Sequence, residues 1–263
     1  MKKMSCALAV VLALLIAVPG AAQAQDNSGK INVTWSKAFI ENTNFLNSVF
    51  YFGYTRNMGT WILQVQAPFS IFDPDSDVID GDSAFGNPRI GFMKYKEGSS
   101  MAWGVGIRPP LAPDDKAAVG WGYLADPVFA GTWQSDYLTA DFMVAWSQQN
   151  EGGISPMVYG GVEFSYYTGD NDAVDSTEFY IPFMAGMSYP MANGSLLAGL
   201  AGNFWLTEDD GSTWDNPLMM AGVGYTFPMG NLMPEIWFGF PISSEYSDAV
   251  DFLLSIGFGF GIP

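Results

Sequence analysis

Large apolar residues occupy every second position near the end of the chain. From Leu254 to Ile262 they alternate with Ser255 and three glycines, so one side of this segment is apolar and the other is almost bare. Side chains on a β-strand point alternately to opposite faces. An apolar face opposite a face of small residues is typical of a strand in the wall of a membrane β-barrel, with lipid outside and a crowded lumen inside.

The same alternation recurs along most of the chain, with turn residues between the segments. In residues 100–109, for example, Trp103 and Val105 oppose Gly104 and Gly106. No segment sustains a 3.6-residue period, so we expect little helix. The sequence predicts an all-β fold, a transmembrane antiparallel β-barrel of about twelve strands, with ten to fourteen possible. The expected strands are residues 46–56, 59–68, 86–95, 100–109, 120–133, 137–147, 155–168, 177–188, 195–206, 217–227, 232–242 and 250–262.

The N-terminal residues 1–24 have the features of a cleaved signal peptide. Lys2 and Lys3 precede a short apolar run, and Ala22-Gln23-Ala24 forms an A-x-A cleavage site. Residues 25–44 are expected to be a periplasmic lead-in or a first strand, and residues 45–263 the barrel. No second apolar run approaches the ~18 residues of a membrane helix. A crossing of the membrane would therefore use a closed barrel, which satisfies every backbone polar group in lipid.

The connections between the expected strands are of two kinds, short turns such as residues 228–231 and long acidic loops such as residues 70–83. Outer-membrane barrels alternate short periplasmic turns with longer outer loops. With the twelve strands above, however, short turns follow odd strands early in the chain and even strands late. Counting residues 31–39 as a strand repairs the first half but makes the total odd.

The charge distribution argues against several classes of partner. The chain has a formal net charge of −17, and every Lys and Arg lies at or before Lys116. Nucleic acid is not an expected partner, because phosphate binding needs a basic face. The chain also contains no histidine, which removes Ser-His-Asp and Cys-His catalytic sites. Cys6 lies in the expected signal peptide, so a zinc or copper site is not expected. We therefore predict that the protein is not an enzyme.

A few charged residues fall on the predicted lumen face of the barrel. A charge inside a barrel must be paired or hydrated. Two interpretations have equal weight: the residues form a selectivity constriction that filters solutes, or they are internal ion pairs that fill the lumen. The candidate lumen and selectivity residues are Arg89, Arg108, Asp141 and Glu163.

Two stretches resemble known outer-membrane proteins. The segment Phe85-Gly86-Asn87-Pro88-Arg89-Ile90-Gly91-Phe92-Met93-Lys94-Tyr95, with the Gly-rich strand and acidic loop after it, resembles the "MetA-pathway of phenol degradation" outer-membrane proteins. Pro109-Pro110-Leu111 departs from the Pro-Thr-Gly of that family. The resemblance implies a barrel with a presumed transport function and no catalytic residues. The chain end also resembles the C-terminal signal read by the barrel assembly machinery, although Pro263 departs from the usual final Phe.

Together these features predict a bacterial outer-membrane protein that is a passive channel or transporter for a small solute, with a hydrophobic or aromatic solute as one option. The alternative is a non-transporting structural or surface-interaction barrel that acts through its acidic outer loops. A secreted soluble β-protein is disfavoured, because the outward faces carry many Trp, Phe, Met and Leu residues. The expected partners are outer-membrane lipid and lipopolysaccharide, the barrel assembly machinery and the solute.

An acidic loop motivates a separate prediction, which is weak calcium binding. Clustered carboxylates suit hard cations, although the twelfth position from Asp73 is Ala84 and not the Glu of an EF-hand. We expect millimolar calcium to raise the melting temperature of the protein. An unchanged melting temperature would leave a solvated acidic loop as the interpretation. The candidate ligands are Asp73, Asp75, Asp77, Asp80 and Asp82.

Overall fold

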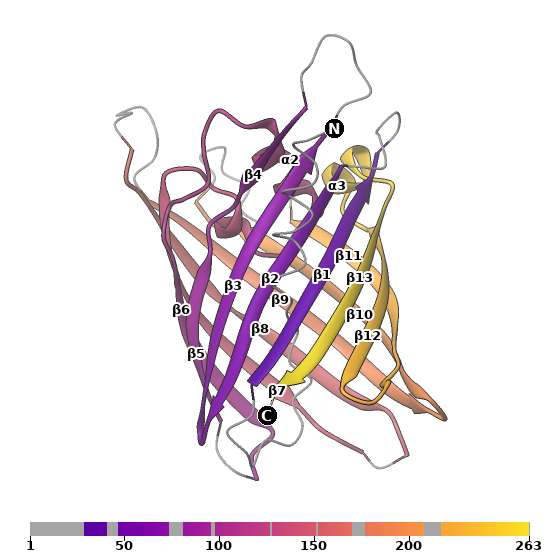
Figure 1. Cartoon of the computed structure of the whole chain (residues 1–263). Helices are drawn as coiled ribbons and strands as arrows, with labels where there is room; N and C mark the ends of the chain where they lie inside the picture. The colour runs from indigo at the N-terminus through magenta and orange to yellow at the C-terminus, as the bar shows by residue number, and fades with distance from the viewer. Residues whose placement is uncertain are drawn as a thin grey trace.

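The alternating segments form strands, and in the computed structural model of the chain these strands join into one antiparallel sheet (Figure 1). The structure describes residues 29–40, 47–73, 81–95, 98–126, 128–150, 152–169, 177–207 and 217–262. The strands are β1 (Gly29–Phe39), β2 (Ser48–Met58), β3 (Trp61–Phe72), β4 (Asp82–Phe85), β5 (Arg89–Tyr95), β6 (Met101–Arg108), β7 (Tyr137–Ser147), β8 (Ser155–Tyr167), β9 (Thr177–Met191), β10 (Gly194–Trp205), β11 (Leu218–Thr226), β12 (Leu232–Pro241) and β13 (Phe252–Ile262).

The sheet closes on itself, because β1 pairs with β13 from Gly29↔Ile262 to Phe39↔Phe252. Each strand of the wall is hydrogen-bonded to the next, and β2 also pairs with β3. The result is a closed barrel of twelve strands with β4 as an extra short strand that pairs with the end of β3. The predicted fold class and strand number are confirmed.

One expected strand was wrong, and one uncertain segment is a strand. Residues 120–133 do not enter the wall, because β6 pairs directly with β7. They contribute to the helix α2 (Ala117–Ala125) and the 3₁₀-helix η1 (Ala130–Thr132). Residues 29–39 form β1 instead. This exchange keeps the total at twelve, and short turns now follow every second wall strand, starting after β2.

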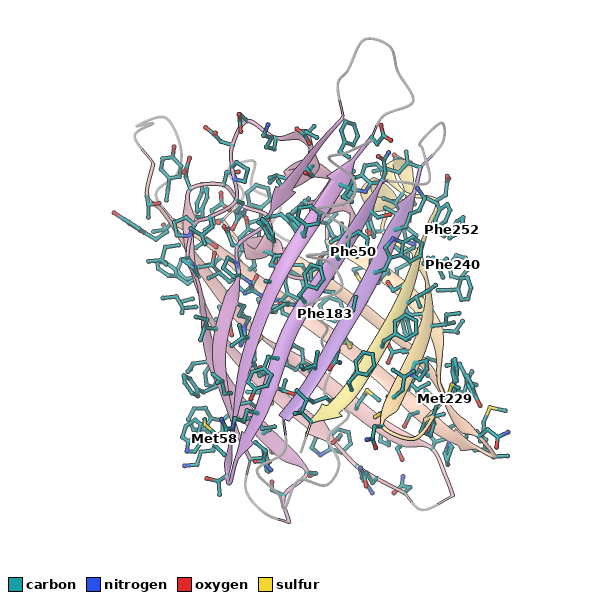
Figure 2. The ribbon with its side chains drawn as sticks, in the orientation of Figure 1. Phe50, Met58, Phe183, Met229, Phe240 and Phe252 are labelled. Atoms are coloured by element: carbon teal, nitrogen blue, oxygen red, sulfur yellow. The ribbon has the colours of Figure 1, made fainter. Side chains whose placement is uncertain are left out.

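The pairing register separates an outer from an inner face. Ile107 of β6 lies opposite Ile90 and Ala140, and Val223 of β11 lies opposite Ala198 and Phe238, all with outward side chains. Figure 2 shows Phe240 and Phe252 projecting from the outer wall. Many of these outward apolar side chains are exposed, as expected for a wall in contact with lipid.

Helix is scarce in the described part of the chain. Besides α2 and η1 it contains the short helix α3 (Ser244–Ala249), between β12 and β13. No described helix has the length and apolarity to cross a membrane. Both α2 and α3 lie near the upper rim of the barrel in Figure 1, at the end that carries the connections β6–β7 and β12–β13.

We predict that the two faces of β10 differ in their tolerance of charge. Leu200 points outward and is 42% exposed, whereas Leu197 faces the lumen. Leu200→Lys is expected to lower the free energy of unfolding by about 2–4 kcal/mol, because the ammonium enters hydrocarbon. Leu197→Lys, the matched control, is expected to cost less than half of that. Urea unfolding in lipid vesicles measures both, and equal losses would contradict the assigned faces.

Candidate functional site

The candidate site is the lumen, which a segment between β6 and β7 fills at the long-loop end. We call the described residues of this connection, 109–126 and 128–136, the inserted segment. Its helix α2 contacts β1, β2, β3 and β4 on one side of the barrel. Ala118, Trp121 and Trp133 of the segment are buried together with Val49 and Tyr51 of β2 and with other lumen-facing residues. The hydrophobic core of this barrel is therefore inside the lumen.

The helix α2 begins where a carboxylate from another element meets it. The Asp82 carboxylate accepts hydrogen bonds from the backbone N–H groups of Ala117 (3.1 Å) and Ala118 (2.9 Å). Free N–H groups at a helix start need such an acceptor, and the residue before the helix, Lys116, supplies none. A contact from β4 thus stabilises a helix in a segment that the sequence pattern assigned to a strand.

The calcium hypothesis concerns the loop before Asp82. Asp75, Asp77 and Asp80 lie outside the described residues. The backbone N–H of Asp73 donates to the side-chain oxygen of Asn47. In the described part of the chain, no group of three His, Cys, Asp or Glu side chains is arranged to hold a metal ion. Calcium binding in this loop stays a prediction.

A polar anchor joins the inserted segment to β2. The hydroxyl of Tyr51 donates to Asp126 (2.8 Å) and accepts a hydrogen bond from the indole N–H of Trp133 (3.3 Å). Burial raises the pKa of Asp126, and the hydrogen bond from Tyr51 opposes this shift. The hydroxyl of Tyr246 in α3 donates to the carbonyl of Leu124 (2.7 Å). The connections β6–β7 and β12–β13 therefore hold each other inside the mouth of the barrel.

Asn87 lies between β4 and β5 and contacts both limbs of the inserted segment. Its side-chain oxygen accepts hydrogen bonds from the backbone N–H groups of Leu111 (2.7 Å) and Ala112 (2.8 Å). Its amide nitrogen donates to the carbonyls of Gly131 (3.0 Å) and Gln134 (2.6 Å). An asparagine amide offers two donors and an acceptor oxygen with two lone pairs, and all are used here.

The four predicted charges come together on the lumen face of β5 to β8 and form one group, the charge cluster. Arg89 forms a two-point contact with Asp141, with Nη2–Oδ1 at 2.6 Å and Nε–Oδ2 at 2.7 Å. Arg108 Nη1 lies 2.5 Å from Glu163 Oε1 and 3.3 Å from Asp141 Oδ2. The cluster has equal numbers of positive and negative groups, and all four residues are buried.

The inserted segment covers the charge cluster. The ring of Phe129 lies over the guanidinium of Arg108, at 5.2 Å from Cζ to the ring centroid. The backbone N–H of Gly131 donates to Glu163 Oε2 (3.5 Å). The same Phe129 ring meets the Tyr159 ring edge-on at 6.2 Å between centroids. In this arrangement the charged wall faces protein and not an open passage.

Glycines on the lumen face provide the space for the cluster. A Cβ atom built on Gly106 would lie 2.6 Å from Arg89 Nη2 and 2.6 Å from Asp141 Oδ2. A Cβ on Gly91 would lie 2.7 Å from Arg89 Nη1. Since real Cβ atoms do not approach so closely, any side chain at these two positions would displace the ion pair. The space left by the glycines of β5 and β6 is thus occupied by the side chain of Arg89.

The opposite wall, from β9 to β12, is different. Lumen-facing glycines of four adjacent strands pair directly in one row, Gly186↔Gly199, Gly199↔Gly222 and Gly222↔Gly239, which we call the glycine row. The indole of Trp237 lies over part of it, since a Cβ on Gly222 would lie 2.4 Å from Trp237 Cζ2. The central lumen-facing neighbours on these strands are uncharged: Met184, Leu197, Met220 and Trp237.

A cavity of about 680 Å³ lies at the short-turn end of this second wall. Its lining includes Ser195, Thr226 and Met233, which face the lumen, and the turn residues Ala192 and Asn193. Among the described residues, this cavity lies at the short-turn end of β9 to β12, whereas the inserted segment fills the long-loop end. Because short turns of outer-membrane barrels face the periplasm, the cavity faces that side.

Comparisons with known proteins agree on the fold. No protein-family model and no curated protein sequence matches the chain. The structure is similar to the crystal structure of the COG4313 outer membrane channel from Pseudomonas putida F1, with a TM-score of 0.63 and 12% identity, over 94% of this chain and 100% of that chain. The crystal structure of the P. putida toluene transporter TodX is a weaker match, with a TM-score of 0.42 and 7% identity over 91% of this chain and 90% of that chain.

These findings place the chain among outer-membrane barrels and no further. The closed twelve-stranded wall, its apolar outer face and the shared fold together indicate a protein of the bacterial outer membrane. The resemblance to the phenol-degradation proteins receives no support from a family model.

We predict that Arg108 and Glu163 depend on each other for stability. Arg108→Met leaves Glu163 buried without its closest charged partner, which is expected to lower the free energy of unfolding by about 3–5 kcal/mol. The double variant Arg108→Met/Glu163→Gln removes both charges and is expected to recover most of this loss. Urea unfolding followed by tryptophan fluorescence measures the cycle. A double variant as unstable as the sum of both single variants would show that the two side chains are not coupled.

Proposed function

We propose that this protein is a passive channel of the bacterial outer membrane for a small hydrophobic or aromatic solute. The observation that carries the proposal is the glycine row with its apolar neighbours, because it forms an uncharged central stretch of the inner wall that wall side chains leave partly bare. A barrel with a purely structural role can fill its interior with its own side chains. Here the long-loop end is filled instead by a segment that does not belong to the wall.

The lining of the lumen supports this class of solute. Met184, Leu197 and Trp237 offer flexible apolar and aromatic contacts along β9 to β12. Methionine side chains adapt to irregular apolar shapes, and aromatic rings favour stacked or edge-on partners. Twelve strands enclose a narrower interior than the sixteen or more strands of general porins. A solute that passes along this wall would therefore be small and would touch it.

The charge cluster has a second role in this proposal. While Phe129 and Gly131 cover it, its ion pairs brace the wall from β5 to β8. Once the inserted segment moves away, the same four residues would line one side of the passage and act on charged solutes. The four residues would then be internal ion pairs while the segment covers them, and a selectivity constriction after it has moved away.

The fold shared with an outer-membrane channel supports transport at the level of architecture. The partners that we propose are outer-membrane lipid, lipopolysaccharide on the outer side, the barrel assembly machinery during insertion, and the solute. The alternative function is a non-transporting structural or surface-interaction barrel, which is favoured by the buried, filled state of the long-loop end.

We predict discrete single-channel steps when the protein, purified from outer membranes, is inserted into a planar lipid bilayer. The expected steps are infrequent, because the inserted segment fills one end of the lumen. A dissolved small aromatic alcohol is expected to reduce the current by contacting the apolar wall. Leu197→Glu, which places a carboxylate on that wall, should abolish the block while the steps remain. A folded barrel without any steps would favour the non-transporting alternative; heat-modifiable gel migration reports folding.

A further inference from the structure

The wall of the barrel is interrupted where Asn87 lies. The strand β3 pairs first with β4, through Phe69↔Phe85, and then with β5, through Gln66↔Arg89. Residues 86–88 between these pairings leave the ladder, and Gly86 keeps only a hydrogen bond from its N–H to the carbonyl of Pro68 (3.1 Å). Pro88 has no N–H to donate. The backbone at this break is therefore free to turn toward the lumen.

At the break, Asn87 forms hydrogen bonds with the inserted segment and not with a neighbouring strand. Its backbone N–H donates to the carbonyl of Thr132 (2.7 Å), in addition to the four side-chain hydrogen bonds described above. The side chain is 1% exposed. One residue thus holds the limb that enters the lumen, at Leu111 and Ala112, and the limb that leaves it, at Gly131 and Gln134.

Other polar contacts also hold the inserted segment, at its helix or at the limb that leaves the lumen. Asp82 bonds the start of α2, and Tyr51 bonds Asp126 at its end. Gln134 donates to Glu178 of β9. Apolar contacts are not directional, so the packing of α2 does not by itself hold the two limbs together. The hydrogen bonds of Asn87 join the entering and the leaving limb at one point of the wall.

We propose that Asn87 is the positioning residue that holds the inserted segment across the lumen, and that breaking its hydrogen bonds frees the segment and opens the passage. This inference rests on the proposed channel function for its transport readout, whereas the position of the segment is measured independently. It assigns a role to a residue that lies outside the charge cluster and outside the apolar wall.

Asn87→Asp tests the assignment with a nearly isosteric change. It replaces the amide nitrogen by an oxygen that faces the carbonyls of Gly131 and Gln134, so two acceptors lose their donor and repel the new carboxylate. Asn57→Asp is the matched control. It adds the same charge to the lumen face of β2, but the oxygen of Asn57 accepts a hydrogen bond from Tyr95 (3.2 Å), and a carboxylate retains that bond.

The position of the segment is read from a buried reporter. Ala118 is 0% exposed, and Ala118→Cys in a Cys6→Ser background carries a single thiol. We expect Asn87→Asp to raise the rate of labelling by a membrane-impermeant thiol reagent about tenfold or more, because labelling follows the population of the displaced segment. We expect the same variant to raise the single-channel current, with Asn57→Asp unchanged in both measurements. Labelling at the rate of the Cys6→Ser/Ala118→Cys protein with native Asn87 would overturn the proposal.

A reversible lock shows whether the current depends on the segment itself. A Cβ on Gly131 lies 3.0 Å from Thr139 Cβ, close to the ~3.5–4.5 Å of a disulfide. In the Asn87→Asp protein with native Ala118, the pair Gly131→Cys/Thr139→Cys is expected to restore the low current when oxidised and to release it on reduction. A high current that persists in the oxidised, fully cross-linked protein would overturn the proposal.

The two hypotheses fail in different ways. Fast labelling of Asn87→Asp without current in any variant would support the positioning role and contradict the channel function. Steps from the unmodified protein together with unchanged labelling of Asn87→Asp would support the channel and contradict the positioning role. If Asn87→Asp does not show the gel migration of a folded barrel, Asn87→Ser replaces it, since serine removes the two amide donors without adding charge.

Discussion

Backbone hydrogen bonding in lipid is the constraint on which this structure depends. A wall that faces hydrocarbon leaves no water for unpaired N–H and C=O groups, so its strands must pair on both sides. The pairing of β1 with β13 removes the last open edge. Because β6 and β7 pair directly, no place in the wall remains for the residues between them. They form α2 and η1 inside the barrel, where their apolar side chains find a core.

Space inside the barrel follows a second rule, in which bare positions and large side chains complement each other. Gly91 and Gly106 leave room for Arg89, and Gly222 leaves room for Trp237. The two kinds of occupant make the walls different: β5 to β8 bury a neutral group of four charges, whereas β9 to β12 are uncharged in the middle of their inner face, between Glu178 and Glu235. Charges buried in this way need partners, and Arg89, Arg108, Asp141 and Glu163 supply them to one another. The opposite wall borders the cavity.

Buried polar groups of the inserted segment also need hydrogen-bond partners. Asp82 accepts hydrogen bonds from the N–H groups at the start of α2, and Tyr51 donates one to Asp126. Asn87 forms hydrogen bonds with backbone groups of both limbs. All three partners lie on or beside β2 and β4, near the break in the wall. Gln134 and Gly131 add contacts to Glu178 of β9 and Glu163 of β8, so the segment is held from both sides of the barrel.

The local pattern of the sequence determined the barrel, eleven of its twelve wall strands, the outward and inward faces, and the inward position of Arg89, Arg108, Asp141 and Glu163, since a strand's alternation is a local property. It could not show that these four residues pair, because Arg108 and Glu163 meet only through the register of β6, β7 and β8. Residues 120–133 have the apolar, glycine-rich composition of a wall strand and yet belong to the inserted segment, because burial on all sides in the lumen favours the same composition. Asn87, Tyr51 and Trp237 carry no local signal, and only closure of the barrel brings them to their partners.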